Sequence, residues 1–394
     1  MSMKRSTSRI RTTHTGSLPR PAEMLDTMRA QAAGQAWDSR AYEAALTRHV
    51  ADIVRKQVEA GIDVVNDGEC SKPSFQTYVA ERLEGFEARM PPGGLPVPTG
   101  PMGVDGRDAQ LFPDFYRNVL ENNPFKNTIR VAPRVCVGPI RYVGHEQLQR
   151  DIRNLKTAMT AAGADEGFLP ASAPVTSLKN EYYKTEEDFI TAYGDAMRQE
   201  YKAILDAGLL LQIDFPTLVS NWDIAGKTMS LADYRKWAEI RIGYLNHALR
   251  GLPEDRIRFH TCYGVNFGPR VTDLQFEDLA DLIFTIKAGA YSFEAANPRH
   301  EHEWHVLERI KLPDGKILIP GVVTHSNVMI EHPETVADRI ERWARVAGRE
   351  NVLFGNDCGF QSTAGNTEIP ITVAWAKLQA LGEGSRIASK RLWN

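Results

Sequence analysis

Short runs of β-branched and aromatic residues alternate with longer helical patterns along this chain. Each run is apolar and is followed by polar residues, glycine or proline, which is the pattern of a buried strand. Eight repeated strand–helix units predict an α/β fold in which a parallel sheet closes into a (β/α)8 TIM barrel. The expected strands cover residues 63–65, 134–137, 167–171, 209–214, 257–262, 291–294, 317–323 and 352–356.

Two of the intervening helices have clear boundaries in the sequence. The first covers residues 40–60, and Gly61 suits its C-cap. The second begins at Pro333, which is tolerated in a first helical turn, and ends at Gly348. Their apolar stripes are Leu46, Val50, Ile53, Val54 and Val58 in the first helix, and Val336, Ile340, Trp343 and Val346 in the second.

The composition is that of a globular protein with a large core. Of 394 residues, 42% are hydrophobic, and 47 basic residues nearly balance 50 acidic ones, so no field attracts nucleic acid or a membrane surface. Four cysteines are too few for a disulfide scaffold and fit a reducing, cytoplasmic compartment. The basic start of the chain has no apolar stretch behind it, and no run reaches the ~18 apolar residues of a membrane span.

We expect one catalytic domain over residues 1–394, because barrels of this type are longer than most single domains. The Pro- and Gly-rich residues 89–106 predict an insertion after the first strand–helix unit. Its composition suits a lid, a subunit contact or a plain surface loop. The sequence therefore leaves open whether the protein is a homo-oligomer.

Four residues that are far apart in the chain have the chemistry of one zinc site. Imidazole, thiolate and carboxylate suit zinc, which takes three protein ligands and an open position in catalytic sites. All four lie where a predicted strand ends, and the carboxyl ends of barrel strands meet at one face. A His-x-Cys pair at a strand end also occurs as a simply packed pair, and this alternative stays open. The four residues are His260, Cys262, Glu294 and Cys358.

Other polar residues are expected at the same face of the barrel. Glu69 and Asp214 each follow an apolar run, and His325 follows another. Two carboxylates at neighbouring strand ends suit an ammonium group, although they also suit an ordinary salt bridge at the rim. No Gly-rich phosphate loop precedes a helix in the sequence, so nucleotide chemistry is not expected.

Six short motifs lie in a fixed order along the chain. They are Thr13-His14-Thr15-Gly16-Ser17-Leu18-Pro19-Arg20, Asn66-Asp67-Gly68-Glu69, Gln212-Ile213-Asp214, His260-Thr261-Cys262, Val323-Thr324-His325-Ser326 and Asn356-Asp357-Cys358-Gly359. Together they resemble the catalytic C-terminal barrel of the cobalamin-independent methionine synthase family, over nearly the whole chain. The resemblance is to a short, single-barrel relative, similar also to the epoxyalkane:coenzyme M transferases.

The resemblance implies a role for each candidate site residue. The four metal-ligand candidates match the ligands of one zinc ion per chain, and no cobalamin is expected. Thr15, Ser17, Glu69 and Asp214 match positions that bind an amino-acid thiol, with the two carboxylates gripping its ammonium group. His325 matches a histidine suited to protonating the leaving group, because imidazole titrates near neutral pH.

The implied reaction is alkyl transfer between two small molecules, a donor and a thiol. Zinc would remove the thiol proton and hold a zinc-bound thiolate ready for attack. The commonest outcome in the family is methyl transfer from a methyltetrahydrofolate-type or other donor to homocysteine, giving methionine. The chain thus resembles a methyltransferase of the 5-methyltetrahydropteroyltriglutamate–homocysteine S-methyltransferase type. The alternative is alkylation of another thiol, such as coenzyme M, by an epoxide or related donor.

Departures from the family pattern bear on the donor and on other function classes. The run after Pro174 lacks the synthases' tryptophan-containing motif, although Tyr182 or Tyr183 could stack on a donor. Residues 360–363 are uncharged where the synthases place basic residues for a folate tail, so a polyglutamylated folate is in doubt. A metal-free barrel of the uroporphyrinogen decarboxylase type and a non-catalytic binding protein also stay open. Three further histidines are expected to face solvent or the donor, namely His300, His302 and His305.

Overall fold

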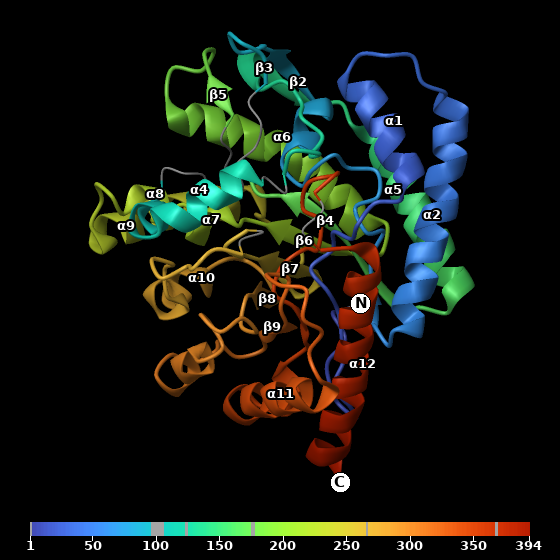
Figure 1. Cartoon of the computed structure of the whole chain (residues 1–394), viewed down its shortest axis with the longest axis vertical. Coiled ribbons are helices and arrows are strands. Elements are labelled where there is room, and N and C mark those ends of the chain that lie inside the picture. Colours follow the sequence, from blue (N-terminus) through green and yellow to red (C-terminus); the bar gives the residue numbers. More distant parts are fainter. Residues whose placement is uncertain (1, 96–105, 123–124, 175–177, 265–266, 367–368) are drawn as a thin grey trace.

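A curved parallel sheet ringed by helices forms the body of the protein (Figure 1). The computed structural model describes residues 2–394 except 96–105, 123–124, 175–177, 265–266 and 367–368. Seven strands lie side by side in chain order and all pair in parallel. They are β1 (Val64–Val65), β4 (Glu166–Ser172), β6 (Leu210–Asp214), β7 (Ile257–His260), β8 (Ala290–Phe293), β9 (Ile317–Val323) and β10 (Gly355–Asn356).

The N-terminal segment closes the sheet into a barrel. Thr12 forms a parallel bridge with Phe354, before β10, and Thr13 forms one with Val64 of β1. Thr13 N–H donates to the Phe354 carbonyl at 2.8 Å, and Val64 N–H donates to the Thr12 carbonyl at 3.0 Å. The predicted (β/α)8 barrel is confirmed, with this short segment at the position between the first and last strands.

The predicted barrel strand at residues 134–137 is wrong. These residues begin β3 (Arg134–Tyr142), which pairs antiparallel with β2 (Leu83–Ala88) and parallel with β5 (Lys179–Asn180) in a separate three-stranded sheet. The run is apolar enough to resemble a barrel strand, but β3 lies on a small sheet that is only partly buried. The segment with Thr12 and Thr13 was not predicted to pair with the sheet, because two threonines do not form an apolar run.

The insertion lies between β2 and β3. Its described part contains α3 (Arg107–Leu111) and α4 (Pro113–Glu121), and α3 packs against α8 (Trp222–Ala225). Most of the predicted insertion at 89–106 falls on residues 96–105, which lie outside the described residues. The described part contacts the loop that follows β7, because Asp108 of α3 accepts from the N–H groups of Arg270 and Val271 at 2.9 and 3.0 Å.

Helices pack in neighbouring pairs around the sheet. Both predicted helices are confirmed, as α2 and α11, with Gly61 and Gly348 at positive φ directly after their last turns. The pairs α2 with α5, α6 with α9, and α11 with α12 are in close contact. No helix in the described part of the chain is long and apolar enough to cross a membrane. The longer helices are α1 (Ala22–Ala32), α2 (Ser39–Glu59), α5 (His145–Ala162), α6 (Glu186–Asp206), α9 (Leu231–Ala248), α11 (Pro333–Ala347) and α12 (Ile371–Trp393); the shorter ones are α7 (Thr217–Ser220), α10 (Ala280–Ile283), and five 3-10 turns, η1 (Thr77–Glu81), η2 (Glu254–Arg256), η3 (Phe276–Asp278), η4 (Glu303–Glu308) and η5 (Arg349–Asn351).

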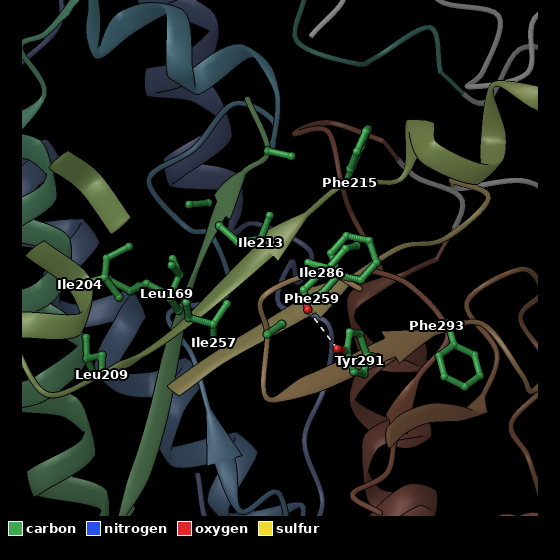
Figure 2. Packing of buried hydrophobic residues seen from close by; sticks show 14 of the residues in the cluster. Leu169, Ile204, Leu209, Ile213, Phe215, Ile257, Phe259, Ile286, Tyr291 and Phe293 are labelled. Atoms are coloured by element: carbon green, nitrogen blue, oxygen red, sulfur yellow. Dashed lines mark hydrogen bonds between the residues drawn. The ribbon is translucent and has the colours of Figure 1, made fainter. Parts of the chain in front are cut away.

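The sheet buries apolar side chains on both faces, as a barrel requires. Outward side chains such as Leu169 meet the helix layer, where Ile204 of α6 and Leu209 pack close by (Figure 2). Inward side chains, including Phe168 and Leu210, form a separate cluster inside the barrel. Each fully buried aliphatic side chain contributes about 1.5–3 kcal/mol. This packed core fixes the strand ends on which the candidate site stands.

Candidate active site

A small pocket opens at the carboxyl ends of the barrel strands. In the sheet register Asp214 of β6 stands beside His260 of β7, and His260 stands beside Ser292 of β8. The pocket has a volume of about 40 Å³. Seven of the nine predicted site residues line it, whereas Glu294 and His325 do not. Its lining is Thr15, Ser17, Glu69, Phe75, Asp214, Pro216, His260, Cys262, Gly264, Cys358, Gly359 and Ser362.

His260, Cys262 and Cys358 form a group that could hold a metal ion. One ligand atom from each lies within 4.8 Å of the others, and all three side chains are buried. Nδ1 of His260 lies 3.1 Å from Ser292 Oγ, while Nε2 has no hydrogen-bond partner among the described residues. A buried ring nitrogen without a partner, beside two thiols, fits a metal ligand whose other nitrogen is oriented by an outer hydrogen bond.

The protonation states of these residues suit metal binding. Burial, helped by Arg258, lowers the pKa of His260 to about 3, so the ring is neutral at pH 7. A hydrogen bond with Cys262, together with burial, raises the pKa of Cys358 well above that of a free thiol. Both cysteines are free rather than joined in a disulfide. A divalent cation bound beside the two cysteines would replace the proton of Cys358 and stabilise its thiolate.

Glu69 is held in the pocket by a left-handed turn after β1. Its φ is +54°, and Gly68 before it has φ +67°. The turn is supported by Asx-type hydrogen bonds, from Gly68 N–H to Asn66 Oδ1 at 2.8 Å and from Glu69 N–H to Asp67 Oδ1 at 3.0 Å. A non-glycine residue at positive φ is unfavourable, and strained residues of this kind cluster at functional sites. The strain is consistent with a carboxylate placed for a ligand.

The negative charges of the buried carboxylates Glu69 and Asp214 are not fully balanced by cations in the pocket. Burial raises the pKa of Asp214 well above its usual range, and the neighbouring Glu69 raises it further. Burial also raises the pKa of Glu69, opposed by Lys72 and Arg20. Arg20 Nη2 lies 3.7 Å from Glu69 Oε2, while Lys72 Nζ is occupied by the Pro170 carbonyl at 2.5 Å. Two buried carboxylates of this kind favour a further cationic partner.

A hydrogen-bonded frame joins the two halves of the pocket. Asn356 Oδ1 accepts from Thr15 N–H at 2.8 Å, and Asn356 Nδ2 donates to the Cys358 carbonyl at 2.6 Å. Gln212 Nε2 donates to the Thr15 carbonyl at 2.6 Å and to Asp214 Oδ1 at 2.8 Å. The carboxylate side and the metal-ligand side are therefore held in one rigid arrangement.

Three buried polar atoms in this pocket have no hydrogen-bond partner in the part of the chain that the structure describes. They are Ser17 Oγ, Glu69 Oε2 and His260 Nε2. Buried polar groups are normally satisfied, so each unsatisfied one calls for an explanation. A bound ligand and metal would satisfy all three, because the atoms belong to residues that line the same pocket.

Glu294 and His325 lie in a second buried cluster with Asp357, in which their ligand atoms lie within 4.8 Å of one another. Burial is the main cause that lowers the pKa of His325 to about 4, so its ring is neutral at pH 7. Its Nε2 lies 2.9 Å from the Gly264 carbonyl. Asp357 Oδ1 accepts from the backbone of Ala295 and Ala296, at 2.7 and 2.8 Å.

The three further histidines lie outside both clusters. His302 and His305 are exposed, and His305 pairs with Glu308. His300 is buried, with Nε2 3.1 Å from Asp273 and Nδ1 3.1 Å from Glu303. Burial lowers its pKa, but these two carboxylates outweigh burial and raise it to about 9. His300 is therefore a structural cation rather than a residue that faces solvent.

Several residues that shape the site were not singled out from the sequence. Gln212 and Asn356 stand inside motifs that were recognised, yet only their contacts reveal what they do. Ser292 is the one small polar residue in strand β8, between Tyr291 and Phe293, and this polar residue was a usable signal. Arg270 has no local sequence signal, because most of its partners lie far away in the chain. They are Asp273, Glu294 and Ser326, which lie 3, 24 and 56 residues later, and Asp108 on the insertion.

Comparison with known proteins shows the family to which the chain belongs. The model of the cobalamin-independent synthase family, for its catalytic domain, matches residues 10–93 and 141–376, and the chain belongs to that family. Among its relatives are methionine synthases of Sulfolobus acidocaldarius and Saccharolobus solfataricus. Each is 25% identical over 97% of this chain, which covers 93% and 95% of the two relatives, respectively.

Solved structures support the fold. A B12-independent methionine synthase from a Shewanella species, in complex with selenomethionine, superposes with a TM-score of 0.70 at 21% identity. A putative vitamin-B12-independent methionine synthase from Listeria monocytogenes gives a TM-score of 0.64 at 17% identity. In both comparisons 98% of this chain and 99% of the other are covered.

Proposed function

We propose that this chain is a zinc-dependent thiol methyltransferase that transfers a methyl group from a donor to homocysteine, giving methionine. One observation carries the proposal: His260, Cys262 and Cys358 share a pocket with Glu69 and Asp214. The first group suits a soft divalent metal, and the second suits the ammonium group of an amino acid. The family and its methionine synthase relatives support the same reaction class.

His260, Cys262 and Cys358 would hold the zinc. Bound there, zinc would lower the pKa of the substrate thiol, so that the sulfur is deprotonated at neutral pH. The chain's own residues then align the thiol and exclude water. Ser292 orients the His260 ring, and Asn356 fixes both Thr15 and the backbone of Cys358. Alignment of this kind is a major part of catalysis in a two-substrate transfer.

The carboxylates favour an amino-acid thiol over a sulfonate such as coenzyme M. Burial raises the pKa of both Glu69 and Asp214, and Glu69 raises that of Asp214 further, so a bound ammonium group would favour the ionised carboxylates. The nearby cations are already engaged: Arg20 donates to the Lys72 carbonyl, and Lys72 donates to the Pro170 carbonyl. A sulfonate would therefore have to displace existing contacts, whereas an ammonium group completes them.

Two further features of the chain bear on the alkyl donor and on the group that protonates its leaving group. Residues 360–363 are uncharged, and the Arg20 guanidinium that contacts this segment already donates to the Gln361 and Lys72 carbonyls, which does not favour a polyglutamate tail there. His325 is our candidate for protonating the leaving group. Its ring is neutral at pH 7 in this arrangement, so it would first have to take up a proton at Nδ1, which has no hydrogen-bond partner among the described residues, before it could donate one to the leaving group.

The test is the metal content of the purified full-length chain, with zinc-edge absorption measured during titration with thiols. We expect one zinc per chain, and an added sulfur ligand with homocysteine but not with coenzyme M at equal concentration. Cys262→Ser and Cys358→Ser should each lose the metal and the turnover while circular dichroism stays that of the wild type. A response to coenzyme M alone would favour the epoxyalkane type of transfer. Full activity in chelator would favour a metal-free barrel and overturn the proposal.

A further inference from the structure

Lys72 is a buried lysine on the turn that carries Glu69. It is only 4% exposed, and its backbone N–H donates to the Glu69 carbonyl at 3.0 Å. Its ammonium group donates to the Pro170 carbonyl of β4 at 2.5 Å and lies 4.2 Å from the centre of the Tyr78 ring. Among the described residues this ammonium group has no direct ion pair. Lysine is almost never buried without a paired carboxylate, so this charge calls for an explanation.

Neighbouring elements fix the position of the Lys72 ammonium group. The Tyr78 hydroxyl of η1 donates to Glu200 Oε1 at 2.8 Å and accepts from Ser172 N–H of β4 at 3.2 Å. The Tyr78 ring is therefore held against the same strand whose Pro170 carbonyl binds the ammonium group. A cation close to an aromatic ring is attracted by its electrons, more strongly where water is excluded. Lys72 thus provides a fixed positive charge rather than a mobile side chain.

The charge of Lys72 acts on both carboxylates of the substrate pocket. Burial raises the pKa of Glu69, and Lys72 opposes this effect more than Arg20 does. Burial and Glu69 raise the pKa of Asp214, and Lys72 is again among the groups that oppose them. A charge that influences these two carboxylates also influences any charged group that a ligand places beside them.

The segment of Ser17 lies against the turn of Lys72. Leu18 N–H donates to the Gly68 carbonyl at 3.1 Å, and a Cβ on Gly16 would lie 3.6 Å from the Pro170 side chain. Ser17 lines the pocket, and its buried Oγ has no hydrogen-bond partner in the part of the chain that the structure describes. This hydroxyl is free to donate to a carboxylate. A carboxylate bound there would lie on the side of the pocket where Lys72 is held.

We propose that Lys72 is a specificity-determining residue, whose charge makes the pocket prefer a thiol with an ammonium and a carboxylate group over a thiol with an ammonium group alone. Lys72 attracts the carboxylate and repels the ammonium group, whereas Glu69 and Asp214 do the opposite. It acts at a distance and keeps its bond to the Pro170 carbonyl. Together the three charges match a zwitterion. The inference rests on the proposed function, since it concerns the acceptor thiol of the same pocket.

Three thiols of similar length separate the two charges of the ligand. Homocysteine carries both, 3-aminopropane-1-thiol carries only the ammonium group, and 4-mercaptobutanoate carries only the carboxylate. Their affinities would be measured by isothermal calorimetry on the zinc-loaded, full-length protein. Lys72→Met should lower the ratio of homocysteine affinity to 3-aminopropane-1-thiol affinity about tenfold, because only homocysteine loses an attraction. It should also weaken 4-mercaptobutanoate, whereas Lys72→Arg, which keeps the charge, should retain most of the wild-type ratio.

The ratio distinguishes a charge effect from a structural one. If Lys72 only supported its turn, its loss would weaken all three thiols by the same factor and leave the ratio unchanged. Lys72→Gln serves if the methionine variant does not fold. The matched control is Lys202→Met, which removes an exposed lysine that pairs with Asp206 on the surface and should change none of the three affinities.

The outcomes separate this inference from the proposed function. If Lys72→Met weakens all three thiols equally, or changes none of them, the inference is overturned while the proposed function stands. The same holds if Lys72→Arg loses the ratio as fully as Lys72→Met, because the charge would then not be the cause. If the zinc-loaded wild type binds none of the three thiols, the proposed function itself fails and the inference fails with it.

Discussion

At the scale of single residues, the paired carboxylates decide which thiol the pocket accepts. Glu69→Gln and Asp214→Asn should each weaken homocysteine binding about 10- to 100-fold, because a hydrogen bond to a charged group contributes about 1.5–3 kcal/mol. The same variants should bind a thiol of similar length that lacks the amine with nearly wild-type affinity. Isothermal calorimetry on the zinc-loaded protein measures both.

The control for this comparison is a carboxylate far from the pocket. Asp206 at the end of α6 pairs with Lys202 on the surface, so Asp206→Asn should change neither affinity. If Glu69→Gln weakened both thiols equally, Glu69 would be stabilising the turn after β1 rather than binding the ammonium group.

At the scale of elements, the close approach of β9 and β10 shapes the loop that carries Cys358. A Cβ on Gly321 would lie 2.7 Å from the Asp357 Cα and 2.8 Å from its backbone nitrogen, and backbone cannot move aside. Gly321→Ala should therefore destabilise the protein by about 1–3 kcal/mol, the range for overpacking, and should also weaken metal binding. Urea unfolding and a chelator competition measure the two effects.

A matched glycine provides the control. Gly243 lies in α9 with open space around its Cβ position, so Gly243→Ala should stabilise the protein by roughly 0.5–1 kcal/mol through helix propensity and leave metal binding unchanged. Equal stability of Gly321→Ala and the wild type would mean that β9 and β10 can separate without cost.

The elements also show what a sequence can reveal. Alternating apolar runs predicted the barrel, and seven of the eight expected strands belong to it. The remaining expected strand, at residues 134–137, was wrong, because an apolar run does not indicate which sheet the strand joins. The order of the sequence motifs predicted one shared site, and five of its residues line one pocket: Thr15, Glu69, Asp214, Cys262 and Cys358. The partners of Glu294 could not be foreseen, because a buried ion pair between a strand end and a distant loop leaves no local pattern.

At the scale of the whole molecule, stability depends on the N-terminal segment that closes the barrel. His14 lies in this segment and is buried, with Nε2 2.7 Å from Gln57 Oε1 of α2. Gly16 N–H donates to Nδ1 at 3.3 Å, so the ring is neutral and Nε2–H donates to Gln57. Burial, with a smaller effect of Arg258, lowers the pKa of His14 to about 4 despite the Gln57 hydrogen bond.

This depressed pKa makes the closure of the barrel sensitive to acid. Between pH 6.5 and about 4 the unfolded chain binds a proton at His14 that the folded chain does not, so the free energy of unfolding falls as pH falls through this window. The loss at pH 5 relative to pH 7.5 should be about 2 kcal/mol from this residue. In His14→Gln, which cannot titrate, the difference between urea unfolding at the two pH values should shrink by that amount. His302→Gln removes an exposed histidine and should keep the wild-type difference. An unchanged pH dependence in His14→Gln would mean that the N-terminal segment opens before the barrel unfolds, since only then would His14 be free to take up its proton in the folded molecule.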